Sequence, residues 1–321
     1  MNVALVGLGR HGSRYAAHLL AGDVPGLRLE LVARGNADAA RAFASEHGVR
    51  WAGSPLDAVA DPGADAVVLC VPPDLTAQFA LPALAAGKAV LVEKPLAADL
   101  AGALAIERAA KKKGLLMVAQ TLRFNSVVRA MAAAAATIGR VHGFSTSQRY
   151  EPLPLAWIED PERGGCLRIT GVHAFDLVRH LTGAEVTRVS CRTIPDGEDA
   201  PAADHAFAAL LHLEPGPVLA TVDNSRLTAG RCGRIELVGE NGSLVGDHVL
   251  GTLVRLHQGE ATPLPVAHPV PTVRECLRAF AAAIRGELPV PITATDGRRA
   301  VAISEGCRRA ARAHREVALR A

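Results

Sequence analysis

A glycine-rich turn near the start of the chain has the spacing of a phosphate-binding loop. Residues 7–12 (GLGRHG) fit the pattern Gly-x-Gly-x-x-Gly and follow the apolar segment 2–6. Between a strand and a helix, this pattern is typical of dinucleotide binding. Gly7 permits a tight turn, Gly9 lets the backbone approach a pyrophosphate, and Gly12 lets helix and strand pack closely. The free N–H groups of the helix then face the phosphates. The alternative is a glycine-rich turn in an unrelated α/β protein.

The end of the second predicted strand, residues 27–33, indicates which dinucleotide is bound. Proteins that bind NAD usually carry an Asp or Glu here, which accepts hydrogen bonds from the ribose 2′-hydroxyl. This chain has Arg34 instead, and no carboxylate at the tip. A guanidinium can bind a 2′-phosphate through two hydrogen bonds, whereas a carboxylate would repel it. We therefore predict that NADP(H) is preferred and that NAD(H) remains possible. The alternative is a solvated Arg34 and mild selectivity.

A lysine follows the fifth predicted strand. The apolar residues 89–92 lead into Glu93-Lys94-Pro95, and ligands of open α/β sheets bind outside the carboxyl ends of the strands. A cation at this place can polarise a carbonyl for hydride attack or stabilise the alkoxide that forms. Burial would lower its pKa toward a range that suits proton transfer. Taken alone, Lys94 is better explained as an exposed lysine at a strand end, and only the surrounding pattern favours the functional role.

Two segments of the chain resemble a known family. Glu93-Lys94-Pro95 is one, and residues 164–176 (GGCLRITGVHAFD), similar to the signature GGxLxDxGxHxxD, are the other. Together they resemble the Gfo/Idh/MocA family of oxidoreductases over roughly the first 180 residues. The resemblance implies an N-terminal Rossmann domain joined to a substrate domain. It also implies that Lys94 contacts the cofactor and the reacting oxygen, and that His173 stands where the family places its general acid/base.

His173 is predicted in the first turn of a helix. The positive end of the helix dipole disfavours imidazolium there, so the ring would be neutral near pH 7. A neutral ring can accept a proton from a substrate hydroxyl as hydride leaves. Outside this motif, a lone histidine is more simply a core or helix-start residue. Asp176 shares its helix face, and it either contacts the substrate or supports the start of the helix.

The chain departs from the family pattern at residue 169. Sugar and cyclitol dehydrogenases of the family usually carry an Asp four residues before the motif histidine, and Ile169 stands there. An aliphatic side chain cannot orient the ring or stabilise its cation, and loss of a comparable carboxylate is very costly in a related triad. Three alternatives follow: Lys94 is the main proton donor, another carboxylate arrives from elsewhere, or the protein is a poor catalyst. The first agrees best with Arg34, because NADPH is commonly the reducing cofactor.

Further site residues are predicted around these positions. Arg10 and Arg14 either reach phosphate or face water. In the family, the turn at Pro72 lines the cofactor, although the His often found shortly after it is replaced by Thr76. Two arginines could hold a carboxylate or phosphate of the substrate, but salt bridges at a domain interface explain each of them equally well. The predicted cofactor-binding residues are Gly7, Gly9, Arg10, His11, Gly12, Arg34, Pro72, Glu93 and Lys94, and the predicted substrate contacts are Arg123, Asn125, Arg168 and Asp176.

The elements that position these residues fall into two domains. Residues 1–120 alternate short apolar runs with helical patterns, which predicts a doubly wound parallel sheet of the Rossmann type. Residues 121–321 contain several adjacent strand-like runs separated by tight turns, which predicts an α+β domain with a large, mostly antiparallel sheet. Whether the last helix, 297–317, packs back on the first domain is left open. An apolar exposed face of the second sheet predicts self-association, which in the family gives dimers or tetramers.

Composition narrows the class of protein. The chain has 321 residues, of which 49% are hydrophobic, 21% charged and 3% aromatic, with a net charge of +3. Neither the mild charge nor the scarce aromatic residues indicate nucleic-acid binding. No signal peptide and no apolar run of about 18 residues is seen, so we expect a cytoplasmic protein without a membrane span. The six cysteines are scattered without zinc spacing, so we predict reduced thiols, Cys166 as a small apolar filler, and no metal site.

These observations favour an NADP(H)-dependent oxidoreductase that transfers hydride to or from a carbon bearing oxygen in a small polar substrate, such as a sugar or cyclitol. Lys94 would polarise the oxygen, and His173 is the candidate acid/base. A dinucleotide-binding sensor or partner protein that has lost turnover is the alternative from another class, and Ile169 favours it. A weaker third interpretation is an imine or biliverdin-type reductase.

Overall fold

The computed structural model describes residues 1–152, 156–161, 163–195 and 203–319, and these form two compact units. The first unit contains residues 1–121 and 271–298, and the second contains residues 122–270 and 299–321. The predicted division at residue 120 agrees with the first boundary. The structure differs from the prediction in residues 271–298, which return to the first unit. Consequently the last long helix, α9 (Ala294–Ala313), passes from one unit into the other.

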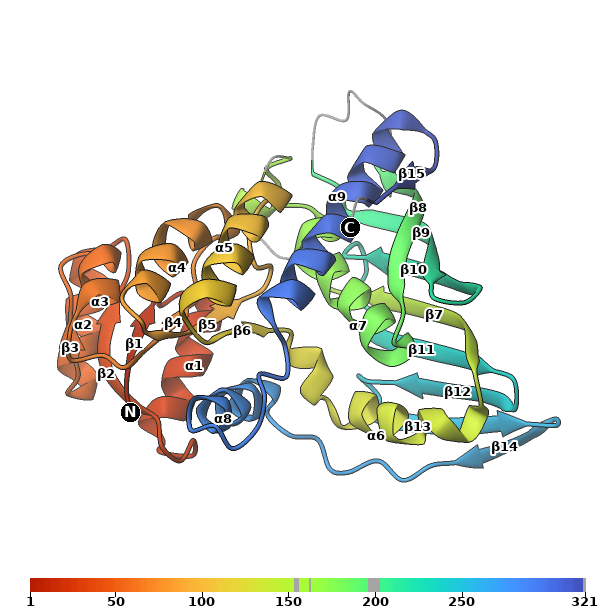
Figure 1. Ribbon diagram of the computed structural model, residues 1–321, viewed down its shortest axis with the longest axis horizontal. Coiled ribbons are helices and arrows are strands. Elements are labelled where there is room, and N and C mark those ends of the chain that lie inside the picture. The colour runs from red at the N-terminus through yellow and green to blue at the C-terminus, as the bar shows by residue number, and fades with distance from the viewer. Residues whose placement is uncertain (153–155, 162, 196–202, 320–321) are drawn as a thin grey trace. The chain divides into compact units, whose positions relative to one another are not determined.

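The first unit is built on a six-stranded parallel sheet with the order β3-β2-β1-β4-β5-β6 (Figure 1). Helices α3, α4 and α5 pack side by side, and α1 packs against α8. Strands β1 and β4 are almost wholly buried because helices cover the sheet, as their continuous apolar sequences predict. The strands are β1 (Asn2–Val6), β2 (Arg28–Ala33), β3 (Arg50–Trp51), β4 (Ala66–Leu69), β5 (Ala89–Glu93) and β6 (Leu116–Ala119). The helices are α1 (Arg10–Leu20), α2 (Ala37–His47), α3 (Pro55–Ala60), α4 (Thr76–Ala85), α5 (Leu100–Lys113) and α8 (Thr272–Ile284).

Polar side chains fix where several of these helices begin. Asn36 accepts a hydrogen bond from the Ala39 N–H at the start of α2, and Ser54 does the same for the Asp57 N–H at the start of α3. Such caps satisfy N–H groups that have no partner within the helix. The Ser54-Pro55 pair in the sequence therefore predicts the beginning of α3 correctly.

The second unit is built on a nine-stranded sheet with the order β14-β13-β12-β11-β7-β10-β9-β8-β15. All neighbouring strands are antiparallel except β7 and β10, which run parallel. Helix α7 packs on β7 and β10, and α6 packs on β12 and β13 (Figure 1). The strands are β7 (Val141–Arg149), β8 (Glu185–Ile194), β9 (Ala206–Glu214), β10 (Val218–Ser225), β11 (Cys232–Gly239), β12 (Gly242–Asp247), β13 (Thr252–His257), β14 (Glu260–Pro263) and β15 (Val317–Ala318). The helices that lie wholly in this unit are α6 (Ser126–Ala134) and α7 (Val172–Thr182).

Both predicted fold classes are confirmed: a parallel Rossmann-type sheet and a larger, mostly antiparallel one. The sequence pattern does not reveal strand β7, although the strand lies at the centre of the second sheet. Its buried side chains are Phe144, Thr146 and Gln148. Two of these three are polar, so the strand lacks the alternating apolar residues by which a strand is recognised in a sequence. None of the helices in the described ranges is long and apolar enough to cross a membrane.

Candidate active site

The glycine loop of the first unit leaves open space at one position and none at two others. A Cβ on Gly7 would lie 2.2 Å from the Cys70 carbonyl oxygen, and one on Gly12 would lie 1.9 Å from the Gly7 carbonyl oxygen. A Cβ on Gly9 would meet no atom within 4 Å. Gly7 and Gly12 are thus required, because the neighbouring backbone leaves no room for a side chain. At Gly9 the space beside the backbone is open, so a ligand can approach it. This cradle fits the pyrophosphate of a dinucleotide.

Helix α1 begins directly after this loop, and its first turn is accessible. Gly9 is the N-cap residue and offers no side chain to the first N–H groups. Arg10 and Arg14 are exposed. Basic side chains and uncapped N–H groups together make an electropositive helix start, which suits a phosphate.

The structure brings three predicted residues together at the end of β5. The Nδ1 atom of His11 lies 3.5 Å from Glu93 Oε1, and Glu93 Oε2 accepts a hydrogen bond of 2.7 Å from the Lys94 N–H. Desolvation, helped by the positive charges of Lys94, Arg14 and Arg10, lowers the pKa of His11 to about 4. His11 is therefore neutral near pH 7.

Burial changes the acidity of both members of the Glu93-Lys94 pair. It raises the pKa of the Glu93 carboxyl, although the Lys94 charge and N–H oppose this shift. It lowers the pKa of the Lys94 ammonium, opposed by the Glu93 charge. An ammonium whose pKa is lowered gives up its proton more readily, so the side chain can serve as a proton donor at the carboxyl end of a strand.

Arg34 lies half-buried at the tip of β2, close in sequence to the cap of α2. Within the described residues, the structure gives its guanidinium no hydrogen bond or ion pair. The nearby Asp38 carboxylate is exposed and lies 3.8 Å from Arg41. Pro72 precedes a short helical turn, η1 (Pro73–Leu75), and Thr76 after it is buried.

The motif of the second unit forms a continuous helix. A π-helical turn, η5 (Leu167–Gly171), runs directly into α7, where His173 is the second residue and is half-buried. Gly171, the residue before α7, is itself helical, so the N–H groups near His173 do not form a free helix end. His173 thus lies in the first turn of α7 as predicted, but the free helix end expected beside it lies one to two turns earlier.

Asp204 holds the true start of this helix. Its Oδ2 accepts a hydrogen bond of 2.7 Å from the Leu167 N–H, and its carbonyl oxygen accepts one of 2.7 Å from the Cys166 N–H. Gly165 has a φ of +94°, and a Cβ there would lie 2.2 Å from Asp204 Oδ1. The motif glycine is thus explained by this contact. The role of Asp204 cannot be predicted from the sequence, since nothing local connects it with residues 164–176.

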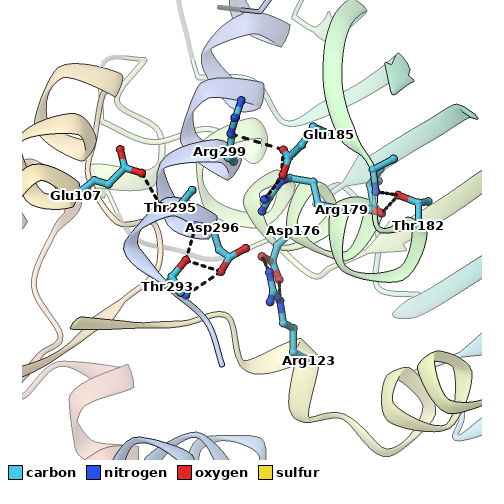
Figure 2. A network of polar contacts seen from close by, with 12 residues as sticks. Glu107, Arg123, Asp176, Arg179, Thr182, Glu185, Thr293, Thr295, Asp296 and Arg299 are labelled. Atoms are coloured by element: carbon cyan, nitrogen blue, oxygen red, sulfur yellow. Dashed lines mark hydrogen bonds and ion pairs between the residues drawn. The ribbon is translucent and has the colours of Figure 1, made fainter. Parts of the chain in front are cut away.

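Arg123 and Asp176, two predicted substrate contacts, are bound to each other (Figure 2). Arg123 Nε donates to Asp176 Oδ2 over 2.7 Å, and Arg123 Nη2 donates to Oδ1 over 2.6 Å. Only 11% and 2% of the two side chains is exposed. Arg123 thus forms a salt bridge, but within the second unit and not at a domain interface as the alternative supposed. Their geometry supports a role in positioning α7.

The other two predicted substrate contacts also have protein partners. Asn125 caps α6 by accepting a hydrogen bond of 2.9 Å from the Val127 N–H, and its Nδ2 donates to the His248 carbonyl over 3.2 Å. Arg168 Nη1 donates to the Pro161 carbonyl over 3.5 Å. Cys166 is buried, and its Sγ lies 3.0 Å from Thr170 Oγ1. Burial raises the pKa of the Cys166 thiol to about 12, which agrees with an inert filler.

Among the residues that the structure describes, no group of three or more His, Cys, Asp or Glu side chains is arranged to hold a metal ion. The six cysteines are free thiols.

Comparison with protein families agrees with both units. Residues 1–120 match the model described as "Oxidoreductase family, NAD-binding Rossmann fold", and residues 128–245 match the "GFO/IDH/MocA C-terminal domain". Together with the open loop at Gly9, these matches define the protein as an NAD(P)-dependent oxidoreductase.

Individual relatives extend over the whole chain. Inositol 2-dehydrogenase 1 of Saccharopolyspora erythraea is 33% identical over 326 residues, which cover 97% of this chain and 94% of that protein. Myo-inositol 2-dehydrogenase of Thermotoga maritima is 27% identical, covering 99% and 98%. The structure of a levoglucosan dehydrogenase in complex with NADH and L-sorbose is similar in fold, with a TM-score of 0.88 at 22% identity, and covers 100% and 99%. The chain belongs to the Gfo/Idh/MocA family.

Proposed function

We propose that the protein transfers a hydride between NADP(H) and an oxygen-bearing carbon of a small polyhydroxylated substrate, such as a sugar or a cyclitol. The observation that carries this proposal is Lys94: a lysine with a lowered pKa at the carboxyl end of β5, in the same unit as the open loop at Gly9. The inositol dehydrogenases among the relatives support the substrate class.

The residues of the chain then have distinct tasks. When bound, the nicotinamide supplies or accepts the hydride. In the direction of reduction, the Lys94 ammonium polarises the substrate carbonyl, and the oxygen takes a proton from Lys94 Nζ as the carbon gains hydride. In the direction of oxidation, the hydroxyl proton passes to an imidazole nitrogen of His173 or to neutral Lys94 as hydride leaves the carbon.

Preference for NADP(H) over NAD(H) is the finer part of the proposal. Arg34 occupies the tip of β2. In the described part of the chain, no carboxylate is bound to its guanidinium. A guanidinium that has no protein partner can bind the two charged oxygens of a 2′-phosphate at little cost. The family model is described as NAD-binding, so NAD(H) with mild selectivity is the competing outcome.

Ile169 supports a second candidate function. Its aliphatic side chain stands four residues before His173 and cannot orient the imidazole or stabilise its cation. A protein that binds the dinucleotide without turnover would tolerate this residue. Such a sensor would bind NADPH tightly and leave every substrate unchanged.

A titration followed by a turnover assay separates the two candidates. Fluorescence titration gives the Kd of NADPH and NADH, and absorbance at the nicotinamide band follows turnover across a panel of polyols, their keto forms and aldehydes. We expect turnover in the wild type, a loss of at least a hundredfold in kcat for Lys94→Met, and wild-type behaviour for Lys112→Met, whose lysine is exposed on α5. NADPH binding without turnover across the panel would support the sensor instead.

Self-association is a further part of the proposal. On β10 the side chains of Val218, Ala220 and Val222 are buried, whereas Leu219 and Thr221 on the opposite face are exposed. Ile194 of β8 is 59% exposed. An uncovered sheet face with large apolar side chains suits pairing with a second copy. Light scattering on a size-exclusion column should show a dimer or tetramer that Leu219→Glu weakens, and a monomer in the wild type would refute this.

A further inference from the structure

A buried carboxyl group connects the candidate proton donor of the first unit with a histidine at the surface. Glu93 is the last residue of β5, directly before Lys94, and only 10% of its side chain is exposed. Its Oε2 accepts the 2.7 Å hydrogen bond from the Lys94 N–H, which holds the carboxyl beside that residue. The other oxygen, Oε1, lies 3.5 Å from the Nδ1 atom of His11. The carboxyl thus contacts the lysine backbone with one oxygen and faces an imidazole with the other.

His11 extends this contact to the surface of the first unit. It is the second residue of α1, and 52% of its side chain reaches solvent. The rest of the ring is enclosed, which is the burial that lowers its pKa to about 4. A neutral imidazole has one nitrogen that donates a proton and one that accepts, so a proton can enter on one side and leave on the other. The ring therefore lies between water and a carboxyl group that water hardly reaches.

The surroundings reverse the usual order of proton affinity between these two groups. An unperturbed histidine has a pKa of 6.5 and an unperturbed glutamate one of 4.5. Burial raises the pKa of Glu93 above that value, whereas burial and three positive neighbours lower the pKa of His11 to about 4. These neighbours are Lys94, Arg14 and Arg10. A proton that reaches His11 from solvent is therefore bound more tightly once it has moved to Glu93.

The other titratable side chains around the carboxyl stay protonated. They are the Tyr15 phenol of α1 and the Cys276 thiol of α8, which are fully buried, and the Cys70 thiol after β4, which is half-buried. Burial raises the pKa of all three, and the negative charge of Glu93 adds to the shift. These groups bear no charge near neutral pH, so they do not compete with the imidazole or the amine for the proton of the carboxyl group.

The proposed reduction needs a supply of protons at Lys94. Its Nζ gives one proton to the substrate oxygen in every turnover, and the amine must regain a proton before it can act again. Glu93 is the ionisable group next to it in the chain. The two side chains also act on each other, since the charge of each shifts the pKa of the other. The carboxyl therefore stands where a proton for Lys94 can be stored.

We propose that His11 and Glu93 form a proton relay that returns a proton from solvent to Lys94 after each reduction. A solvent acid protonates His11 Nε2, and the Nδ1 proton passes to Glu93 Oε1. The carboxyl then gives a proton to the neutral Lys94 amine, directly or through one water molecule. The carboxylate is regenerated, the imidazole is neutral again, and one proton has moved from the solvent acid to Nζ. The inference rests on the proposed function, because a relay is needed only if Lys94 exchanges protons.

The test uses the full-length protein with NADPH and the keto compound that it reduces fastest in the panel. His11→Ala removes the ring and leaves space for free imidazole, and Glu93→Gln removes the acid at similar size. His18→Ala is the matched control, because His18 lies on the same helix and its Nδ1 is 3.1 Å from the Asp23 carboxylate. We measure the first turnover by stopped flow, the steady-state kcat as a function of imidazole concentration, the Kd of NADPH and the Tm.

We expect His11→Ala to keep the rate of the first turnover, because Lys94 carries its proton at the start, and to lower the steady-state kcat about tenfold. Free imidazole should restore most of this loss, since the small molecule takes the place of the missing ring. Glu93→Gln should lower kcat at least as much, but imidazole should not restore it, because the last step to Lys94 is missing. His18→Ala should have the kcat of the wild type, with no response to imidazole.

A second measurement needs neither cofactor nor substrate. Titration of the histidine signals by NMR gives the pKa of His11 directly, which should be about 4 in the wild type. In Lys94→Met the pKa of His11 should rise, because one of the positive charges that lower it is gone. An unchanged pKa of His11 in this variant would mean that the two ends of the relay do not interact, and it would refute the inference.

Two further results would overturn the relay. If His11→Ala keeps the steady-state kcat of the wild type, protons reach Lys94 by another route. If its first turnover slows as much as the later ones and imidazole restores nothing, His11 shapes the loop or holds the cofactor and moves no protons. Failure of the proposed function looks different: the wild type itself would bind NADPH and turn over nothing in the panel, while the coupling of His11 to Lys94 would persist in the NMR titration.

Discussion

The ion pair of Arg123 and Asp176 allows a quantitative prediction. In Asp176→Asn the side chain keeps its size but loses its charge, so Arg123 keeps a guanidinium without this carboxylate. Breaking a buried ion pair by removing one partner costs about 3–5 kcal/mol. Because 11% of the Arg123 side chain reaches solvent, we expect the lower end, about 3 kcal/mol. At about 2–4 °C per kcal/mol for a unit of this size, the Tm should fall by about 6–12 °C.

Scanning calorimetry or thermal unfolding followed by circular dichroism measures this change. The neighbouring pair of Arg179 and Glu185 is the matched control (Figure 2). Its hydrogen bonds are equally short, at 2.8 and 2.6 Å, but 42% of the Glu185 side chain is exposed. Only 8% of the Arg179 side chain is exposed, so this pair is half-buried. Because water still reaches the Glu185 carboxylate, Glu185→Gln should lower the Tm by less than Asp176→Asn does.

A double variant distinguishes the ion pair from a loss of shape. Arg123→Met combined with Asp176→Leu replaces the pair by apolar side chains, which is often neutral for stability. It should recover most of the Tm lost in Asp176→Asn. The reasoning is refuted if Asp176→Asn keeps the wild-type Tm and instead raises KM. That result would make Asp176 a substrate contact rather than a positioning residue.

Three further predictions concern the candidate site. Arg34→Ala should weaken NADPH binding by about 10- to 100-fold, since hydrogen bonds to charged groups contribute about 1.5–3 kcal/mol. The Kd of NADH in a fluorescence titration should not change. Equal weakening of NADPH and NADH binding would contradict the 2′-phosphate contact. The pH profile of reduction should fall as pH rises through the pKa of Lys94, which burial lowers below 10.5, and Lys94→Arg should move this limb to higher pH; a profile that is flat up to pH 10 contradicts proton donation. Ile169→Asp should raise kcat of oxidation about tenfold if His173 is the base, and a kcat that does not change excludes that role.

The sequence predicted the first unit well because its signals are local. Strands β1, β4 and β5 are short apolar runs, and the Gly7–Gly12 loop and Lys94 follow directly after strands. In a parallel sheet, residues that follow neighbouring strands meet at one edge. The position of the glycine loop and of Lys94 at this edge therefore follows from sequence order alone.

The second unit was harder to predict because its strands and contacts do not show themselves locally. Strand β7 has one large apolar inward residue, Phe144, beside Thr146 and Gln148, so its periodicity resembles that of an exposed loop. Arg123 and Asp176 are 53 positions apart, and Asn125 and His248 are 123 apart. Each of these residues has a side chain that could equally bind substrate, and only the fold reveals its partner.

The π-helical turn before His173 illustrates the same difference. A histidine at the start of an apolar helical pattern suggests a free helix end, and with it a local electrostatic effect. Residues 167–171 are helical as well, because Asp204, from a distant part of the chain, caps the segment at Leu167. The dipole end moves with the cap, so a residue 31 positions after His173 changes the electrostatics of the ring. The surroundings of His173 are thus set by tertiary structure, whereas the place of Lys94 follows from the strand before it. Asp204→Ala should accordingly loosen the start of the helix at Leu167 and lower the Tm, without affecting NADPH binding.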